Sequence, residues 1–226
     1  MKIERYDAEL HSSSSARRAP DWQFFLASTS PRRAELLRTI GLPFACVPVG
    51  VEEPLPNAQD ELEPGRFVER LAHLKAVSCE VNGLCGSGLG QSIILAADTV
   101  VWHKGRILNK PRDAADACCM LKRLRNETHR VLTGMALRVH RQDNDECFVA
   151  HEVTQVTFGD ASDEWIERYV ATDEPLDKAG AYAAQGRGAV LIERIEGDFW
   201  NVVGLPLARL THMLAAIGAP LETWWR

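Results

Sequence analysis

The sequence lacks any pair of cysteines at C-x-x-C spacing, although six cysteines are present among its 226 residues. No histidine lies at zinc-finger spacing from any of the six. Because structural zinc sites use clustered thiolates and imidazoles, a zinc site is not expected. The cysteines are instead expected to be reduced and to fill buried positions as small apolar side chains.

Hydrophobic runs long enough to cross a membrane are also lacking, since none approaches the roughly 18 residues that a spanning helix needs. The N-terminal residues lack the apolar segment of a secretory signal. We therefore expect a cytoplasmic protein with no membrane partner.

An excess of positive charge is lacking as well, because the formal net charge is −5. A surface of this sign repels the phosphate backbone, so no nucleic-acid polymer is expected as a partner. A smaller polyanionic ligand would need a local basic cluster or a metal ion.

What the sequence does contain is enough apolar material, 46% of all residues, to build a full core. Residues 1–21 are polar and carry a run of four serines without periodicity, which predicts a flexible N-terminal extension. Residues 22–226 are then expected to form one α/β domain.

The expected strands and helices alternate through most of this domain, which is typical of α/β proteins. In chain order, they are a strand and helix within 24–41, a strand at 44–49, a helix at 65–82, a glycine-rich flexible connection at 83–90, a central strand at 92–101, a hairpin through 101–108, a helix at 113–125, strands at 131–139 and 146–158, a helix at 163–171, a binding loop dense in small residues at 174–190, a closing hairpin through 192–203 and a helix at 207–217.

The strand and helix within 24–41 carry the strongest local signal. Ser30 is expected to cap the helix with its hydroxyl, Pro31 suits the first helical position, and Gly41 suits the residue after the end. Arg32 and Arg33 break the pattern, because cations are unfavourable at the positive end of a helix dipole. They are either two solvated arginines or, together with the hydroxyls of Ser28 and Ser30, a cradle for phosphate.

An acid interrupts the nearly continuous apolar run of the expected central strand. Asp98 lies inside this run, and a buried carboxylate is costly unless it is paired, binds a metal or faces a cleft. It is therefore either a functional acid or a structural carboxylate that caps backbone N–H groups. Lys110, after the hairpin, could reach the same cleft, whereas Lys75 on the helix at 65–82 is expected to be solvated.

Several short motifs, taken together, resemble the Maf family of nucleoside triphosphate pyrophosphatases over residues from Phe25 to about Leu214. They occur in the family's order and spacing, and they are Leu26-Ala27-Ser28-x-Ser30-Pro31-Arg32-Arg33, Glu52-Glu53, Ala97-Asp98-Thr99-Val100, Lys110-Pro111, Asp177-Lys178-Ala179-Gly180-Ala181-Tyr182, Gln185-Gly186 and Gly204-Leu205-Pro206-Leu207.

The resemblance implies a single domain in which a mixed, twisted sheet is flanked by helices, with two lobes around a deep cleft, as in the inosine triphosphate pyrophosphatases. It also implies a homodimer and a divalent metal, Mg²⁺ or Mn²⁺, held by Glu53 and Asp98. Asp98 would be the proton acceptor, and Arg32, Thr99 and Gln185 would match the family's specificity positions. The other implied cleft residues are Ser28, Arg33, Lys75 and Lys110.

Within the family, residues 97–99 and 178–185 are similar to the branch that hydrolyses dTTP and UTP. The branch acting on 7-methyl-GTP typically has Ser-Asp-Gln at the first of these sites and an acid at the second, and this chain has neither. The expected function is therefore hydrolysis of dTTP and UTP to the monophosphate and pyrophosphate, which removes unwanted nucleotides from the cellular pool. The alternatives are a 7-methyl-GTP-type pyrophosphatase and a non-catalytic nucleotide-binding regulator of cell division.

Overall fold

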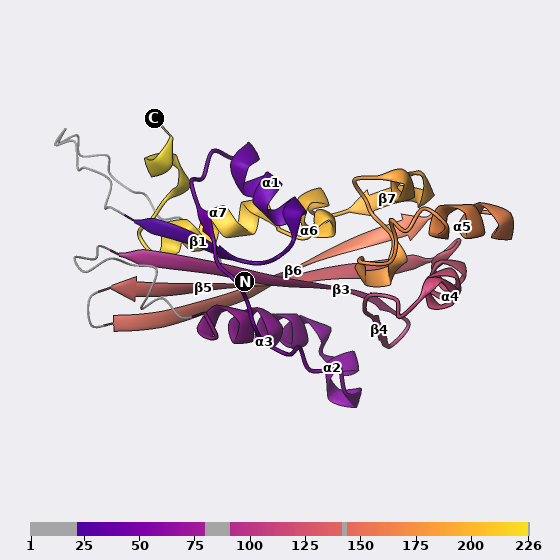
Figure 1. The fold of residues 1–226 in the computed structure, drawn as a ribbon, viewed down its shortest axis with the longest axis horizontal. Coiled ribbons are helices and arrows are strands. Elements are labelled where there is room, and N and C mark those ends of the chain that lie inside the picture. The colour runs from indigo at the N-terminus through magenta and orange to yellow at the C-terminus, as the bar shows by residue number, and fades with distance from the viewer. Residues whose placement is uncertain (1–21, 80–90, 142–143, 226) are drawn as a thin grey trace, which may run out of the picture.

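The structure, a computed structural model, describes residues 22–79, 91–141 and 144–225 (Figure 1). The expected extension at 1–21 and the expected glycine-rich connection at 83–90 lie outside the described residues. The elements are β1 (Gln23–Ala27), α1 (Pro31–Thr39), β2 (Ala45–Cys46), α2 (Ala58–Leu62), α3 (Pro64–Val77), β3 (Ser92–His103), β4 (Arg106–Leu108), α4 (Ala114–Leu124), β5 (Thr128–Arg141), β6 (Asn144–Phe158), α5 (Asp163–Val170), β7 (Ile192–Glu196), α6 (Phe199–Val203) and α7 (Leu207–Ala216), with 3₁₀ turns η1 (Ala179–Ala181), η2 (Arg187–Leu191) and η3 (Leu221–Trp224).

Seven strands form one mixed sheet, in which the order is β2-β1-β3-β5-β6-β7 and β4 pairs with β3. β1 runs parallel to β2 and to β3, and the remaining pairs are antiparallel. Helices cover both faces: α3 lies on one face, and α1, α6 and α7 lie on the other (Figure 1). The predicted single α/β domain with a mixed sheet flanked by helices is confirmed.

The long strands β3, β5 and β6 extend through both ends of the molecule and join two groups of helices. α1, α7 and η3 cover a core at one end, which includes Leu26 and Leu95. α4 and α5 cover a second core at the other end, which includes Phe158 and Tyr182. Figure 1 shows α4, α5 and β7 gathered at this second end.

The pairing of β3 is continuous on one side and interrupted on the other. On one side β3 pairs with β5 from Ser92 to Trp102. On the other side it pairs with β1 through residues 92–96 and with β4 through residues 101–103. The described strands therefore leave residues 97–100 without a neighbour on this side. The gap lies at the carboxyl end of β1, the kind of position where ligands bind in open α/β sheets.

Most of the predicted helices are confirmed to within a residue or two, and at α5 the predicted cap is confirmed as well. The Ser162 side chain accepts a hydrogen bond from the Trp165 N–H at the start of α5. The predicted hairpin through 192–203 is wrong, however, since only its first half is a strand. The second half is α6, in which Asp198 caps the Trp200 N–H and Gly204, at φ +120°, follows the last turn.

Several smaller expectations also change. The helix predicted to reach residue 82 ends at Val77, the strand predicted at 44–49 is only Ala45–Cys46, and the short helix α2 was not expected. Cys46 and Cys119 are exposed, so the prediction that all cysteines are buried is wrong, although Cys79 is buried. No helix among the described residues is long and apolar enough to cross a membrane.

Candidate active site

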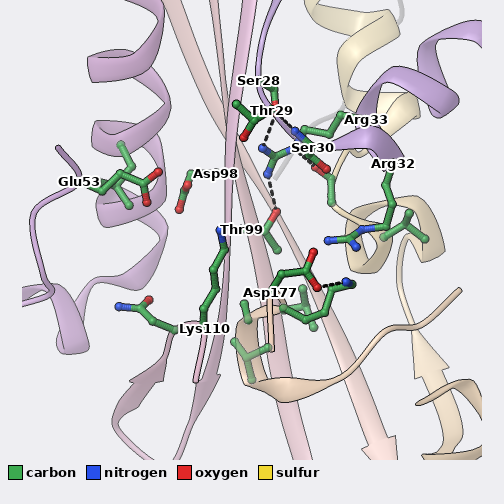
Figure 2. A pocket seen from close by; sticks show the side chains of 18 of the residues that line it. Ser28, Thr29, Ser30, Arg32, Arg33, Glu53, Asp98, Thr99, Lys110 and Asp177 are labelled. Atoms are coloured by element: carbon green, nitrogen blue, oxygen red, sulfur yellow. Dashed lines mark hydrogen bonds and ion pairs between the residues drawn. The ribbon is translucent and has the colours of Figure 1, made fainter. Parts of the chain in front are cut away.

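A cavity of about 440 Å³ opens at the gap beside β3, and Figure 2 shows it from close by. Its walls come from the loop after β1, the loop before α2, the helix α3, the gap itself, the turn after β4, and the segment after α5. The sequence predicted nine site residues on these elements, and all nine line the cavity: Ser28, Arg32, Arg33, Glu53, Lys75, Asp98, Thr99, Lys110 and Gln185.

Arg33, in the first turn of α1, is fixed by three neutral acceptors. Its Nε donates to the Gly204 carbonyl at 2.8 Å, and its two terminal nitrogens donate to the hydroxyls of Ser28 and Thr99, each at 3.1 Å. Burial lowers the pKa of Arg33 from its usual value, and the carboxylates of Asp98 and Glu53 oppose that shift. Because a guanidinium has five N–H donors and these bonds use three, two remain to bind an anion.

Thr99 links this arginine to the interior of the sheet. The Thr133 hydroxyl donates to the Asn201 carbonyl at 3.1 Å, so it must accept from the Thr99 hydroxyl, which lies 2.9 Å away. Thr99 in turn accepts from Arg33. This chain of hydrogen bonds holds the guanidinium in a single orientation before any ligand arrives.

Arg32 completes the basic side of the cavity. It is half-buried, and it extends from the first turn of α1 toward Asp177 (Figure 2). The predicted cap by Ser30 is wrong: its side chain makes no capping bond, and its backbone N–H instead donates to the Ser28 hydroxyl at 3.2 Å. This first turn therefore holds two arginines and has no acid or hydroxyl cap of its own, which favours an anionic ligand.

Asp98 lies on the acidic side of the cavity, where α3 covers the sheet. Its carboxylate pairs with the ammonium of Lys75, which also contacts a Glu53 oxygen at 2.8 Å. The side chains of Asp98 and Lys75 are 12% and 11% exposed. The partner of Asp98 is thus an ammonium group rather than the backbone N–H groups of a structural cap. Lys75 bridges the two acids, so it is not solvated as its helix position alone suggested, and it lies in the cavity, as the family resemblance implied.

The same two acids form the site where a divalent metal could be held. Nζ of Lys75 lies between them, so both carboxylates already converge on one cation. The described residues contain no group of three or more metal-ligating side chains. Mg²⁺ commonly binds one or two carboxylates and completes its shell with water and substrate phosphates, so the pair is sufficient for a metal shared with a phosphate ligand.

Two further charged residues line the cavity, Asp177 and Lys178, which the sequence analysis quoted within a motif without giving them a site role. Their side chains form an ion pair. Burial alone would raise the pKa of Asp177, but the hydrogen bond from Lys178 and the positive charges of Lys178 and Arg32 lower it. The signal that could have identified them was their place in a small-residue motif directly before Gln185.

The small residues of this motif, predicted to form a binding loop, allow a close approach to β3. Gly180 has φ +68°, and a Cβ added there would lie 2.7 Å from a methyl group of Val101. Its N–H donates to the Asn109 carbonyl at 3.1 Å. The exposed Lys110, next along the chain, points into the cavity (Figure 2).

These features define a class: an α/β protein whose cavity holds an oriented guanidinium and other cationic side chains beside a pair of carboxylates. Such a cavity suits a polyanion that binds next to an acidic centre. A family model described as Maf-like protein matches residues 23–217, and the chain belongs to this family.

Relatives from several bacteria are similar to this chain over almost their whole length. A protein of Symbiobacterium thermophilum named dTTP/UTP pyrophosphatase is 48% identical over 201 residues, which cover 89% of this chain and 97% of the relative. Proteins of the same name from Moorella thermoacetica and Thermosipho melanesiensis are 46% and 40% identical, over 89% and 84% of this chain and 97% and 94% of the relatives.

Proposed function

We propose that the chain is a nucleoside triphosphate pyrophosphatase that hydrolyses dTTP and UTP to the nucleoside monophosphate and pyrophosphate. The observation that carries this proposal is the position of Asp98, a nearly buried carboxylate within the same cavity as Arg32, Arg33 and Lys110. The names of the relatives from three bacteria support the pyrimidine substrates.

In the proposed reaction, a water oxygen attacks the α-phosphorus and the bond from this phosphorus to the bridging oxygen breaks. Asp98 accepts a proton from the attacking water, and Glu53 and Asp98 would together hold Mg²⁺ or Mn²⁺. The bound metal would supply positive charge to the phosphates and lower the pKa of coordinated water. Arg32, Arg33, Lys75 and Lys110 stabilise the charge that develops on the departing pyrophosphate.

The test is a panel of nucleoside triphosphates assayed with Mg²⁺ or Mn²⁺, with pyrophosphate release as the readout. Wild type should cleave dTTP and UTP well and ATP poorly. Asp98→Asn should lose at least about a hundredfold in turnover, because general base catalysis typically contributes ~10²–10⁴-fold. A variant that folds normally and keeps more than about a tenth of the rate would remove Asp98 from the mechanism.

A non-catalytic regulator of cell division is the second candidate function. The carboxylates of Glu53 and Asp98 count against it, because acids beside a triphosphate would repel it and weaken simple binding. Tight binding of dTTP without pyrophosphate release, with either metal, would favour the regulator. Preferential cleavage of 7-methyl-GTP in the same panel would instead favour the other branch of the family.

The proposed assembly is a homodimer in the cytoplasm. β6 pairs with β7 only through Gln155–Phe158, so its outer edge from Asn144 to Thr154 has no neighbour among the described strands. Val149 and Val153 on this stretch are 43% and 38% exposed. A free, partly apolar edge of this kind can pair with the same edge of a second copy.

A further inference from the structure

The segment 182–188, which carries Gln185, has no regular structure of its own except the start of η2. Gln185 is exposed and lines the cavity. A side chain that reads a nucleobase must be held within a fraction of an ångström, so something outside the segment has to fix its backbone.

Two side chains outside the segment supply that support. The Tyr169 hydroxyl, at the end of α5, accepts a hydrogen bond from the Ala183 N–H at 3.1 Å and donates to Oε1 of Glu174 at 2.9 Å. The Glu174 carboxylate then accepts from the Arg187 N–H and the Gly188 N–H, each at 3.1 Å. These bonds tie both flanks of Gln185 to one phenol and one carboxylate.

The glycines of the segment are packed against the same two groups. A Cβ added at Gly186 would lie 2.7 Å from Oε1 of Glu174, and a Cβ added at Gly188 would overlap the Tyr169 hydroxyl. Burial alone would raise the pKa of Glu174, but the three hydrogen bonds and the charge of Arg187 lower it, so the carboxylate stays ionised as an acceptor. The close packing shows that the segment is shaped around Tyr169 and Glu174.

We infer that Tyr169 and Glu174 are positioning residues for substrate selection, which act by holding the backbone on both sides of Gln185 in the conformation that recognises a pyrimidine. This inference rests on the proposed function, since it names the support of the proposed base-reading residue. Neither residue lines the cavity, so neither is expected to contact the phosphates or to take part in the hydrolytic step.

Glu174→Gln is the sharpest substitution. Its amide keeps the size of the side chain, but one of its two ends must face an N–H group and cannot accept from it. We expect the kcat/KM for dTTP to fall by roughly tenfold or more, about the effect of one lost hydrogen bond, mainly through a higher KM. The kcat/KM for ATP should change little, so the preference for dTTP over ATP narrows. Glu167→Gln, on the exposed face of α5, removes a nearby carboxylate and should leave the preference unchanged.

Two further measurements separate positioning from general damage. Amide hydrogen exchange should become about tenfold faster or more in residues 182–188 of Glu174→Gln and stay the same in α1 and β3. The double variant Glu174→Gln/Gln185→Ala should prefer dTTP over ATP no less than Gln185→Ala alone, because both changes abolish the same contact between Gln185 and the base.

If Glu174→Gln does not fold, Tyr169→Phe tests the inference in its place, because it deletes only the hydroxyl. It should narrow the preference for dTTP over ATP in the same way. Folded variants that retain the wild-type preference, or that lose all substrates equally through kcat, would overturn the inference. A wild type that cleaves no triphosphate, or that prefers ATP, would instead overturn the proposed function.

Discussion

Gln185 shows what a single exposed side chain can contribute at the mouth of the cavity. Its amide can both donate to and accept from a pyrimidine edge. Gln185→Ala should slow dTTP and UTP by about tenfold while ATP is almost unaffected, since the loss of one hydrogen bond to the base costs about 1.4 kcal/mol. Ratios of kcat/KM for the three nucleotides measure this. An unchanged ratio would exclude Gln185 from base recognition.

His129 is a second residue with a defined consequence, because burial lowers its pKa to about 3. Its Nε2 lies 2.9 Å from the Tyr182 hydroxyl, and its ring packs edge-to-face on Phe158 and Tyr182. The unfolded chain takes up a proton near the ordinary value of 6.5, whereas the folded chain does not. The contribution of His129 to the unfolding free energy is therefore complete above pH 6.5, and it is lost as the pH falls from 6.5 toward about 3.

The expected slope is about 1.4 kcal/mol of unfolding free energy per pH unit within this window. Urea unfolding of wild type and His129→Asn at a series of pH values measures it, and the difference between the two curves isolates the contribution of His129. His212→Asn removes an exposed imidazole and serves as the matched control. Parallel curves for wild type and His129→Asn would show that this imidazole does not stay neutral in the folded chain.

At the scale of an element, α1 combines a destabilising charge pattern with its proposed role in binding the triphosphate. Arg32→Ala should raise the stability of the ligand-free protein by roughly 0.3–1 kcal/mol, because it removes a cation from the positive end of the helix. The same change should weaken triphosphate binding and turnover. Thermal unfolding and steady-state kinetics test both halves, with Arg38→Ala in the last turn of α1 as the control. If Arg32→Ala were less stable than wild type but fully active, Arg32 would have a structural role and no role in binding.

The elements also show which parts of the fold could be read from sequence. α1 and α5 were predicted because Pro31, Gly41 and Ser162 are signals that act within one turn. α6 was mistaken for a strand, since its five residues are too few to show helical periodicity and are rich in aromatic and branched side chains. Its caps, Asp198 and Gly204, were the better signal.

In the site, too, the sequence predicted the residues that belong to short motifs but not the contacts between distant segments. The quoted motifs contain every predicted cavity residue except Lys75, which only the family resemblance implied. The pairing of Lys75 with Asp98 depends on contact between α3 and β3, 23 positions apart. The supporting roles of Tyr169 and Glu174 depend on how the chain after α5 folds back. No periodicity or spacing in the sequence encodes such contacts directly.

At the scale of the whole molecule, the free edge of β6 predicts the assembly. Val149→Lys/Val153→Lys places charges on this edge and should convert a dimer to a monomer, because unpaired edges are protected by charge. Light scattering coupled to size exclusion measures the mass. Leu62→Lys on α2, where Leu62 is 77% exposed, is the matched control. A wild-type monomer, or a double variant that remains dimeric, would exclude this edge as the interface.

The gap in β3 also means that the two sides of the cavity and the segment with Gln185 come from different parts of the chain. Asp98 and Thr99 are consecutive residues of one strand, so they point to opposite faces of the sheet and are joined by a single peptide unit. The separation between the acidic side and the phosphate side is therefore built into the backbone of a central strand. The segment that carries Gln185 belongs to a different part of the chain. Under the proposed function, substitutions in that segment would change which nucleobase is accepted and would leave the hydrolytic step at Asp98 unchanged.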